Sequence, residues 1–117
     1  MNINNVDIKT DIKKRCVIGI KGQTLDPNYP IDICFDSLKS MASVLSVENQ
    51  RLLKIIAEQE PKSVTELAEL TGRAVSNVSR TLKTLKKYDI VTLQSSKNCL
   101  YARTNHHNFV VIINNEN

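Results

Sequence analysis

The residues best suited to chemistry lie in the stretch 75–87, which reads VSNVSRTLKTLKK. At about 100° per residue, a helix over this range gathers four aliphatic side chains in a stripe that we expect to be buried: Val75, Val78, Leu82 and Leu85. The opposite side carries short hydrogen-bonding side chains and cations: Ser76, Asn77, Arg80, Lys83, Thr84 and Lys87. A solvated helix face usually mixes both signs of charge. This face contains no acid, which indicates an anionic partner.

The hydrogen-bonding groups on this face match the edges of DNA bases. A carboxamide such as that of Asn77 can bond the N6/N7 edge of adenine, and a guanidinium such as that of Arg80 can bond O6 and N7 of guanine. Lysine ammonium groups neutralise phosphates. We therefore expect four residues to lie nearest the bases: Ser76, Asn77, Arg80 and Thr84. Four others are assigned to phosphates: Arg73, Lys83, Lys87 and Lys97.

The segment before this helix predicts a second, shorter helix over 63–71. Ser63 and Glu66 fit a capping box, in which each side chain satisfies a backbone N–H at the start of a helix. Gly72 suits the left-handed residue that ends many helices. A helix, a tight turn and a second helix form the helix-turn-helix unit, whose second helix enters the major groove of DNA.

The residues that follow predict a β-hairpin. IVTLQ and CLYART are rich in strand-forming residues and flank the polar turn SSKN. Such a hairpin directly after the recognition helix would be a wing, with Lys97 at its tip in reach of a phosphate or the minor groove. Upstream, apolar spacing predicts helices over 36–45 and 46–60, the second capped by Ser46 and ended by Pro61.

The two ends of the chain predict strands. The N-terminal candidates are VDIKTDI, CVIGI and IDICF, and the C-terminal candidate is FVVII. The expected fold is therefore α+β, a winged helix-turn-helix with additional N-terminal and C-terminal strands. We expect three parts: a strand-rich segment over 1–35 for dimerisation or partner binding, a DNA-binding domain over 36–104, and a strand with a frayed tail over 105–117.

The distribution of charge favours the same interpretation. From Arg73 to Arg103 there are seven basic residues and one acid, a sum of +6. From Val44 to Gly72 there are three basic and five acidic residues, a sum of −2. The second half of the predicted domain therefore concentrates positive charge, as a nucleic-acid-binding surface does.

Residues 36–94 resemble the winged helix-turn-helix domain of MarR/ArsR-type transcriptional regulators, and more narrowly the small antitoxin-like DNA-binding proteins of that superfamily. The resemblance rests on SVTELAELTGRAVSNVSRTLKTLKKYDIV and on the helix ending LLKIIAEQEP. It implies a homodimeric regulator, expected to be a repressor, that sometimes pairs with a toxin. Two residues depart from the pattern. Ala74 replaces a capping residue before the recognition helix, and Asp89 replaces the usual glycine before the wing.

Three alternatives remain beside DNA-dependent repression. A metal- or redox-responsive regulator would need soft ligands, and the only cluster is Cys99, His106 and His107, without a paired-cysteine motif. A protein-interaction module would use the N-terminal strands to neutralise a toxin. RNA binding is disfavoured because the recognition helix lacks aromatic residues for stacking. No nucleophile–base spacing or glycine-rich phosphate loop indicates an enzyme, and no cofactor is expected.

Composition sets the outer limits. The chain has 117 residues, 41% of them hydrophobic and 24% charged, which is typical of one folded domain. No apolar run is long enough to span a bilayer and no signal peptide is visible, so we expect a cytoplasmic protein without a membrane partner. The three widely spaced cysteines predict reduced thiols, with Cys16 and Cys34 buried among apolar strand residues.

Overall fold

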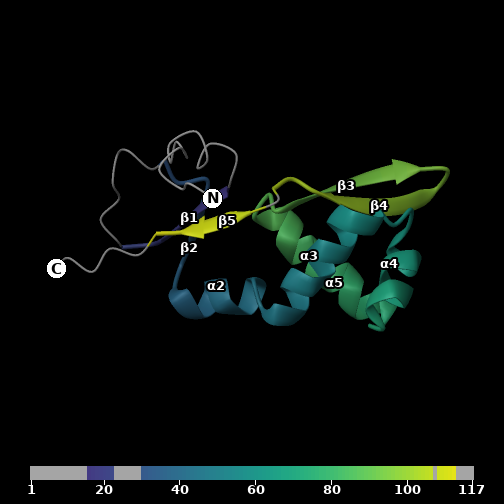
Figure 1. Cartoon of the computed structure of the whole chain (residues 1–117), viewed down its shortest axis with the longest axis horizontal. Coiled ribbons are helices and arrows are strands. Elements are labelled where there is room, and N and C mark those ends of the chain that lie inside the picture. The colour runs from purple at the N-terminus through teal and green to yellow at the C-terminus, as the bar shows by residue number, and fades with distance from the viewer. Residues whose placement is uncertain (1–15, 23–29, 107, 113–117) are drawn as a thin grey trace, which may run out of the picture. The chain divides into compact units, whose positions relative to one another are not determined.

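A computed structural model describes residues 16–22, 30–106 and 108–112. Within these ranges the protein is an α+β structure of four helices and five strands (Figure 1). Residues 42–105 form one compact unit, and the described residues of 1–41 and 106–117 form the other. The strand predicted from VDIKTDI and the side chain of His107 lie outside the described residues.

The first unit contains a three-stranded sheet in the order β2-β1-β5, and both pairings are parallel. Its strands are β1 (Cys16–Ile20), β2 (Ile33–Phe35) and β5 (Phe109–Val111). All five residues of β1 are buried. A continuous apolar run is typical of a central parallel strand covered on both faces. The predicted strands CVIGI, IDICF and FVVII are thus confirmed, the last two in shortened form.

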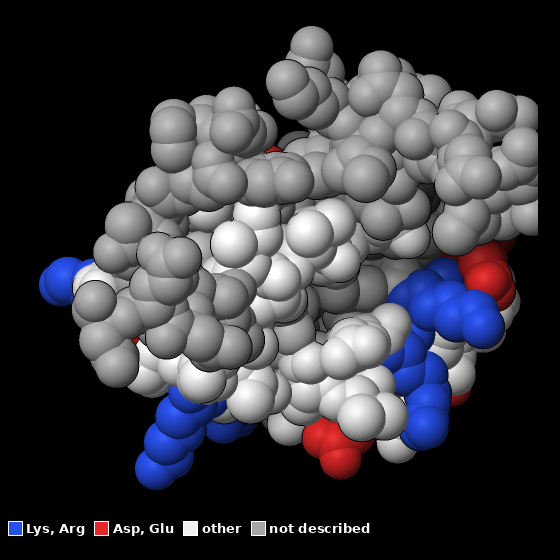
Figure 2. Space-filling model, turned by 60° about the vertical axis from the view of Figure 1, so that its left-hand side comes forward, with Lys and Arg blue, Asp and Glu red and all other residues white. Residues whose placement is uncertain are grey.

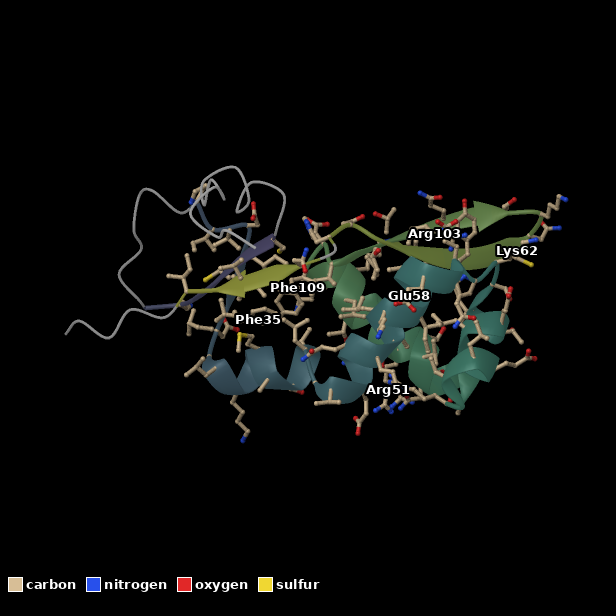
Figure 3. The ribbon with its side chains drawn as sticks, in the orientation of Figure 1. Phe35, Arg51, Glu58, Lys62, Arg103 and Phe109 are labelled. Carbon is tan, nitrogen blue, oxygen red and sulfur yellow. The ribbon has the colours of Figure 1, made fainter. Side chains whose placement is uncertain are left out.

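Side-chain and backbone contacts fix the register of this sheet. The N–H of Val17 donates to the Asp32 carboxylate at 2.8 Å, and the N–H of Asp32 donates to the Val17 carbonyl at 2.8 Å. Ile20 pairs with Phe35 and Cys16 with Phe109. Alternate residues of a strand share a face, so the two phenylalanines project from the same face of the sheet (Figure 3).

The second unit holds three helices and a hairpin, and helix α2 spans the boundary between the units. Helix α2 comprises Leu38–Val44, and the three helices of the unit are α3 (Val47–Gln59), α4 (Val64–Thr71) and α5 (Val75–Lys87). The hairpin strands are β3 (Val91–Ser96) and β4 (Cys99–Thr104). The core is built from one apolar stripe on each element: Leu52, Leu53, Ile56, Leu67, Ala68, Val78, Leu82, Leu85, Ile90, Val91 and Ala102. Helix α2 contributes no buried residue.

The predicted helix starts are confirmed, with one correction. Ser46 accepts the N–H of Asn49 at 3.2 Å, and Ser63 accepts the N–H of Glu66 at 3.0 Å. The Glu66 carboxylate, however, accepts the N–H of Lys62 at 2.9 Å. The predicted capping box has the backbone N–H of Ser63 as the donor to this carboxylate, so the observed bond is displaced by one residue. The side chain of Glu66 is long enough to reach either amide of the extended segment before α4.

The end of α5 has the geometry of a Schellman motif. The N–H of Ile90 donates to the Leu85 carbonyl and that of Asp89 to the Lys86 carbonyl, both at 2.9 Å. Asp89 adopts the left-handed conformation with φ 59°. Asp89, which replaces the glycine usual at this position, therefore adopts the same backbone conformation that a glycine would adopt there.

The hairpin closes with a two-residue turn at Lys97 and Asn98, whose φ angles are 51° and 65°. Positive φ at both central residues is the type I′ arrangement, which matches the twist of the flanking strands. The turn is shorter than the predicted SSKN, because Ser95 and Ser96 pair within β3. Lys97 lies at the tip, as expected. Among the described residues, no helix has the length and apolar character that crossing a bilayer requires.

Candidate nucleic-acid interface

The polar face of α5 is exposed over its whole length. The six residues predicted for it are all exposed: Ser76, Asn77, Arg80, Lys83, Thr84 and Lys87. Val78, Leu82 and Leu85 are buried on the opposite side. Helix α5 contains no acid, and its last turn carries Lys86 and Lys87. The structure therefore brings the predicted base-contacting and phosphate-contacting residues of this helix together on one surface of positive charge.

Val75 does not belong to the buried stripe. Its side chain is 46% exposed, so the prediction that it is buried was wrong. Val75 occupies the first helical position, and the chain enters α5 there from the turn after Gly72. The neighbouring core is closed by residues one turn further along the helix, where Val78 is fully buried. An aliphatic side chain is therefore presented to solvent at the start of the polar face.

Arg73 is held inside a hydrogen-bond network that the sequence did not reveal. Its guanidinium donates to the side-chain oxygens of three residues: to Asn77 through both Nε and Nη2, to Thr81 at 2.8 Å and to Asn49 at 3.2 Å. Asn49 comes from α3, whereas Asn77 and Thr81 come from α5. Arg73 therefore ties the first two turns of α5 to the start of α3.

This network changes what two predicted site residues can do. The Oδ1 atom of Asn77 accepts from Arg73, so the hydrogen bonds that Asn77 can still offer to a base are those donated by its Nδ2 amide. The Arg73 guanidinium has protein acceptors on both terminal nitrogens. Its assignment to phosphate stays a prediction, and its contacts give it a positioning role as well. Sequence spacing contained a partial signal, because residues 73 and 77 are one helical turn apart.

The N-terminus of α5 lacks a side-chain cap. Ala74 occupies the N-cap position with extended backbone and accepts no hydrogen bond through its side chain. The departure noted in the sequence therefore has the expected local effect. Thr84, a predicted base contact, donates its hydroxyl to the Arg80 carbonyl at 3.3 Å. Its hydroxyl oxygen still has lone pairs directed away from the helix.

The hairpin is anchored by Arg103, a residue that sequence reasoning counted only as positive charge. Its Nη1 donates to the Pro61 carbonyl at 2.8 Å, and its Nη2 donates to the Glu60 carbonyl at 3.2 Å. The guanidinium also lies 4.6 Å from the centre of the Tyr101 ring. Figure 3 labels Arg103 and Lys62 on this side of the unit. Arg103 thus fixes the hairpin that carries Lys97 against the α3–α4 loop.

Positive charge is not uniform over the rest of the surface. In the view of Figure 2, Lys and Arg side chains project beside Asp and Glu side chains. Helix α4 carries Glu66 and Glu69, both exposed, on the element that precedes α5. Helix α5 carries four cations and no acid, α2 carries one lysine and no acid, and α3 and α4 both contain glutamates. Among the four helices described here, positive charge is therefore concentrated on α5.

The family model HVO_A0114 matches residues 44–102, half of the chain. The chain belongs to the HVO_A0114 family. The matched segment contains α3, α4, α5, β3 and most of β4, and with them every predicted site residue. No curated protein gives a match to the sequence.

The cysteines of this HVO_A0114 member differ in environment. Cys16 is fully buried in β1, and burial, with a smaller contribution from the Asp32 carboxylate, raises the pKa of its thiol from 9.0 to about 11. Cys34 is exposed, so the prediction that it is buried was wrong. It sits between two buried residues of a short strand and projects from the opposite face. Cys99 is also exposed.

The metal site weighed from the sequence stays an alternative, because His107, one of its three candidate ligands, lies outside the described residues. Over residues 16–22, 30–106 and 108–112, no three His, Cys, Asp or Glu side chains gather closely enough to hold an ion. His106 contacts Phe109, with ring centroids 6.3 Å apart in an edge arrangement. That contact is an aromatic packing interaction.

Proposed function

We propose that this protein is a winged helix-turn-helix transcriptional regulator that binds duplex DNA in a sequence-specific manner. Helix α4, the turn at Gly72 and helix α5 correspond to the helix-turn-helix, and the β3–β4 hairpin corresponds to the wing. The observation that carries the proposal is the exposed, acid-free face of α5, which combines amide, guanidinium and hydroxyl groups with lysines. A major groove presents the complementary acceptors and donors between two rows of phosphates.

The proposal divides the work along α5. Arg80 lies almost opposite the buried stripe, so it points deepest into the groove, where a guanidinium bonds guanine through two hydrogen bonds. Ser76, Asn77 and Thr84 contact neighbouring bases. The exposed methyl groups of Val75 suit the C5-methyl group of thymine, the one apolar group in the major groove. Lysines 83, 87 and 97 neutralise phosphates.

The active form is proposed to be a homodimer. One recognition helix makes too few base contacts for high specificity, so two copies would bind half-sites about 10 base pairs apart or a multiple of that. Helix α2 supports this because it has an apolar stripe but buries none of it. Among the described residues, β2 and β5 are the outer strands of the parallel sheet, and the terminal strands are proposed as a second surface. A dimer that covers a promoter would act as a repressor.

The test is selection of bound fragments from genomic DNA, followed by binding of Arg80→Ala to the selected duplex and to scrambled DNA. We expect Arg80→Ala to weaken binding to the selected duplex by about 1–3 kcal/mol and to relax the preference at one base position. Lys87→Ala serves as the control. It should weaken both duplexes alike and reduce the salt dependence of log K by about one unit.

Two results would contradict the proposal. If Arg80→Ala lowers both affinities equally, Arg80 does not read a base. If the protein prefers single-stranded RNA over every duplex, or binds no nucleic acid, α5 does not enter a major groove. Co-purification from the native host would identify a protein partner such as a toxin. If this protein binds a toxin but has no affinity for DNA, its function is neutralisation of the toxin and not regulation of transcription.

A further inference from the structure

A cleft of about 450 Å³ lies beside the hairpin, and none of its described lining residues belongs to α5. Its lining comes from the two strands of the hairpin, their turn and the α3–α4 loop: Lys62, Ser96, Lys97, Cys99, Tyr101 and Arg103. Both elements belong to the unit formed by residues 42–105, so the cleft is a feature of one compact body. Pockets of about 300–1,000 Å³ are the size that small molecules occupy in proteins.

The lining is cationic. Lys62, Lys97 and Arg103 contribute three positive charges, and no carboxylate is among the lining residues. Two acids lie near this loop. Glu66, in the first turn of α4, uses its carboxylate to accept the backbone N–H of Lys62, and Glu60, within the loop, accepts from Arg103 through its backbone carbonyl. The hydroxyl of Ser96 and the thiol of Cys99 can donate hydrogen bonds, whereas the phenol of Tyr101 already donates to Gln94.

The guanidinium in this cleft is fixed before any ligand arrives. Arg103 is held by the carbonyls of Glu60 and Pro61 and stacks on the ring of Tyr101, whose hydroxyl donates to Gln94 at 2.6 Å. A fixed guanidinium loses little side-chain entropy on binding an oxyanion. Lys62 and Lys97 flank it from two different elements, the α3–α4 loop and the hairpin turn.

We propose that this cleft is a binding site for the phosphate group of a small molecule. A phosphate dianion offers three strong acceptor oxygens, and three cations from two elements match its number of acceptors and are opposite to it in charge. The concave shape favours a small ligand over the continuous backbone of a duplex. The site shares Lys97 with the proposed DNA contacts, but it also includes Lys62, which lies outside the basic segment of the sequence. A bound ligand would hold Lys97, and with it the hairpin tip, against the loop.

The experiment is an NMR titration of the full chain with inorganic phosphate at constant ionic strength, with chloride replaced as phosphate is added. We expect saturable shifts of the backbone amides of Lys62, Ser96, Lys97 and Cys99. Lys62→Gln and Lys97→Gln should each weaken binding by about tenfold, because each removes one charge-assisted contact. Lys54→Gln is the matched control, since it removes the same charge from an exposed position of α3 that does not line the cleft.

Two kinds of result would count against the site. Shifts that rise linearly without saturation, or that Lys54→Gln reduces as much as Lys62→Gln, would mean general attraction of anions to a basic protein. A second arm measures duplex binding by Lys62→Gln without phosphate. If that variant loses DNA affinity and inorganic phosphate does not saturate, the phosphate belongs to a DNA backbone and the small-molecule site is rejected. Failure of DNA binding with retained phosphate binding would instead contradict only the proposed function.

Discussion

At the scale of single residues, Asp89 adopts a left-handed backbone conformation that is unfavourable for most residues other than glycine. Asp89 has φ 59° because the Schellman motif at the end of α5 requires a left-handed residue there. An L-residue in this region costs roughly 1–2 kcal/mol, although Asp visits it more readily than most. The buried pair Leu85 and Ile90, which the motif brings together, offsets this cost.

Replacement of Asp89 by glycine should therefore stabilise the protein. We expect Asp89→Gly to raise the free energy of unfolding by about 0.5–1 kcal/mol, because relief of the left-handed strain exceeds the added entropy of the unfolded chain. Urea unfolding measures the change. Asp89→Asn is the control, since it removes the charge but tolerates the conformation, and it should change stability by less than about 0.5 kcal/mol. If both variants raise the free energy of unfolding equally, the increase comes from removal of the Asp89 charge and not from relief of backbone strain.

The buried thiol of Cys16 makes a prediction about pH. Its pKa is raised from 9.0 to about 11 by burial and by the Asp32 carboxylate, so between these values the folded state keeps a proton that the unfolded chain releases. The free energy of unfolding should then fall as pH rises from about 9 to about 11, by up to about 1.4 kcal/mol per pH unit. Cys16→Ala, compared by urea unfolding at pH 8, 9 and 10, should lack this component. A difference between the two proteins that stays constant with pH would contradict it.

At the scale of elements, Arg73 links the start of α3 to the first turns of α5. Its guanidinium reaches acceptors on both helices, which a single lysine ammonium group cannot reproduce. Because the N-terminus of α5 has no side-chain cap, this network supplies much of what positions that end of the helix. The same turn carries Ser76 and Asn77, two of the predicted base contacts.

Loss of Arg73 should therefore affect stability. We expect Arg73→Ala to lower the free energy of unfolding by about 1–2 kcal/mol, with only partial recovery in Arg73→Lys. Arg80→Ala, on the exposed face of α5, is the matched control and should change the free energy of unfolding by less than about 0.5 kcal/mol. A double-mutant cycle with Thr81→Val should show coupling. Independent effects in that cycle would mean that the network does not position α5.

Short-range rules predicted the helical elements well. Ser46, Ser63 and Gly72 mark boundaries through local hydrogen bonds and backbone preference, and each lies where the pattern placed it. The polar face of α5 followed from helical periodicity alone. Val75 did not, because whether a first-turn residue is buried depends on the direction from which the chain enters the helix. The carboxylate of Glu66 likewise accepts from the N–H of Lys62 and not from that of Ser63, and the sequence does not distinguish these two adjacent amides.

Long-range pairing was beyond the sequence patterns. The strand at 109–111 pairs in parallel with the strand at 16–20, and this contact joins residues from opposite ends of the chain. A period of two residues gives the faces of a strand but not its neighbours, so it could not show that the two terminal segments share a sheet. The exposure of Cys34 follows from the same limit. Its face is set by the register with β1, in which Cys34 pairs with Gly19.

At the scale of the whole molecule, the chain combines two compact units with different contents. The HVO_A0114 match covers the unit that holds α3 to β4, whereas the parallel sheet lies outside the matched residues. All residues proposed to contact DNA belong to the matched unit. The proposed roles of dimerisation and DNA binding are therefore assigned to different parts of the chain, and mutation can separate them.

Mutation of the apolar stripe of α2 should separate dimerisation from DNA binding. Leu38 is 46% exposed, and Met41 and Leu45 are only half-buried, although their spacing is that of a buried helix face. We expect the protein to sediment as a dimer at micromolar concentration, and Leu38→Glu to convert it to a monomer, because an unpaired carboxylate in an apolar interface is costly. Lys39→Glu is the matched control. It introduces the same side chain one position along the helix, on the polar side, and should leave the dimer intact.

The dimer prediction extends to DNA. With Leu38→Glu, affinity for a selected duplex with two half-sites should fall towards that for one half-site, whereas the residual binding should still respond to Arg80→Ala, because the recognition helix itself is unchanged. Gel shifts on duplexes with one and two half-sites measure both effects. A wild-type protein that sediments as a monomer, free and on DNA, would contradict the role of α2. Loss of the response to Arg80→Ala in the monomer would instead mean that α2 supports the fold of the DNA-binding unit, a result that circular dichroism of Leu38→Glu would detect independently.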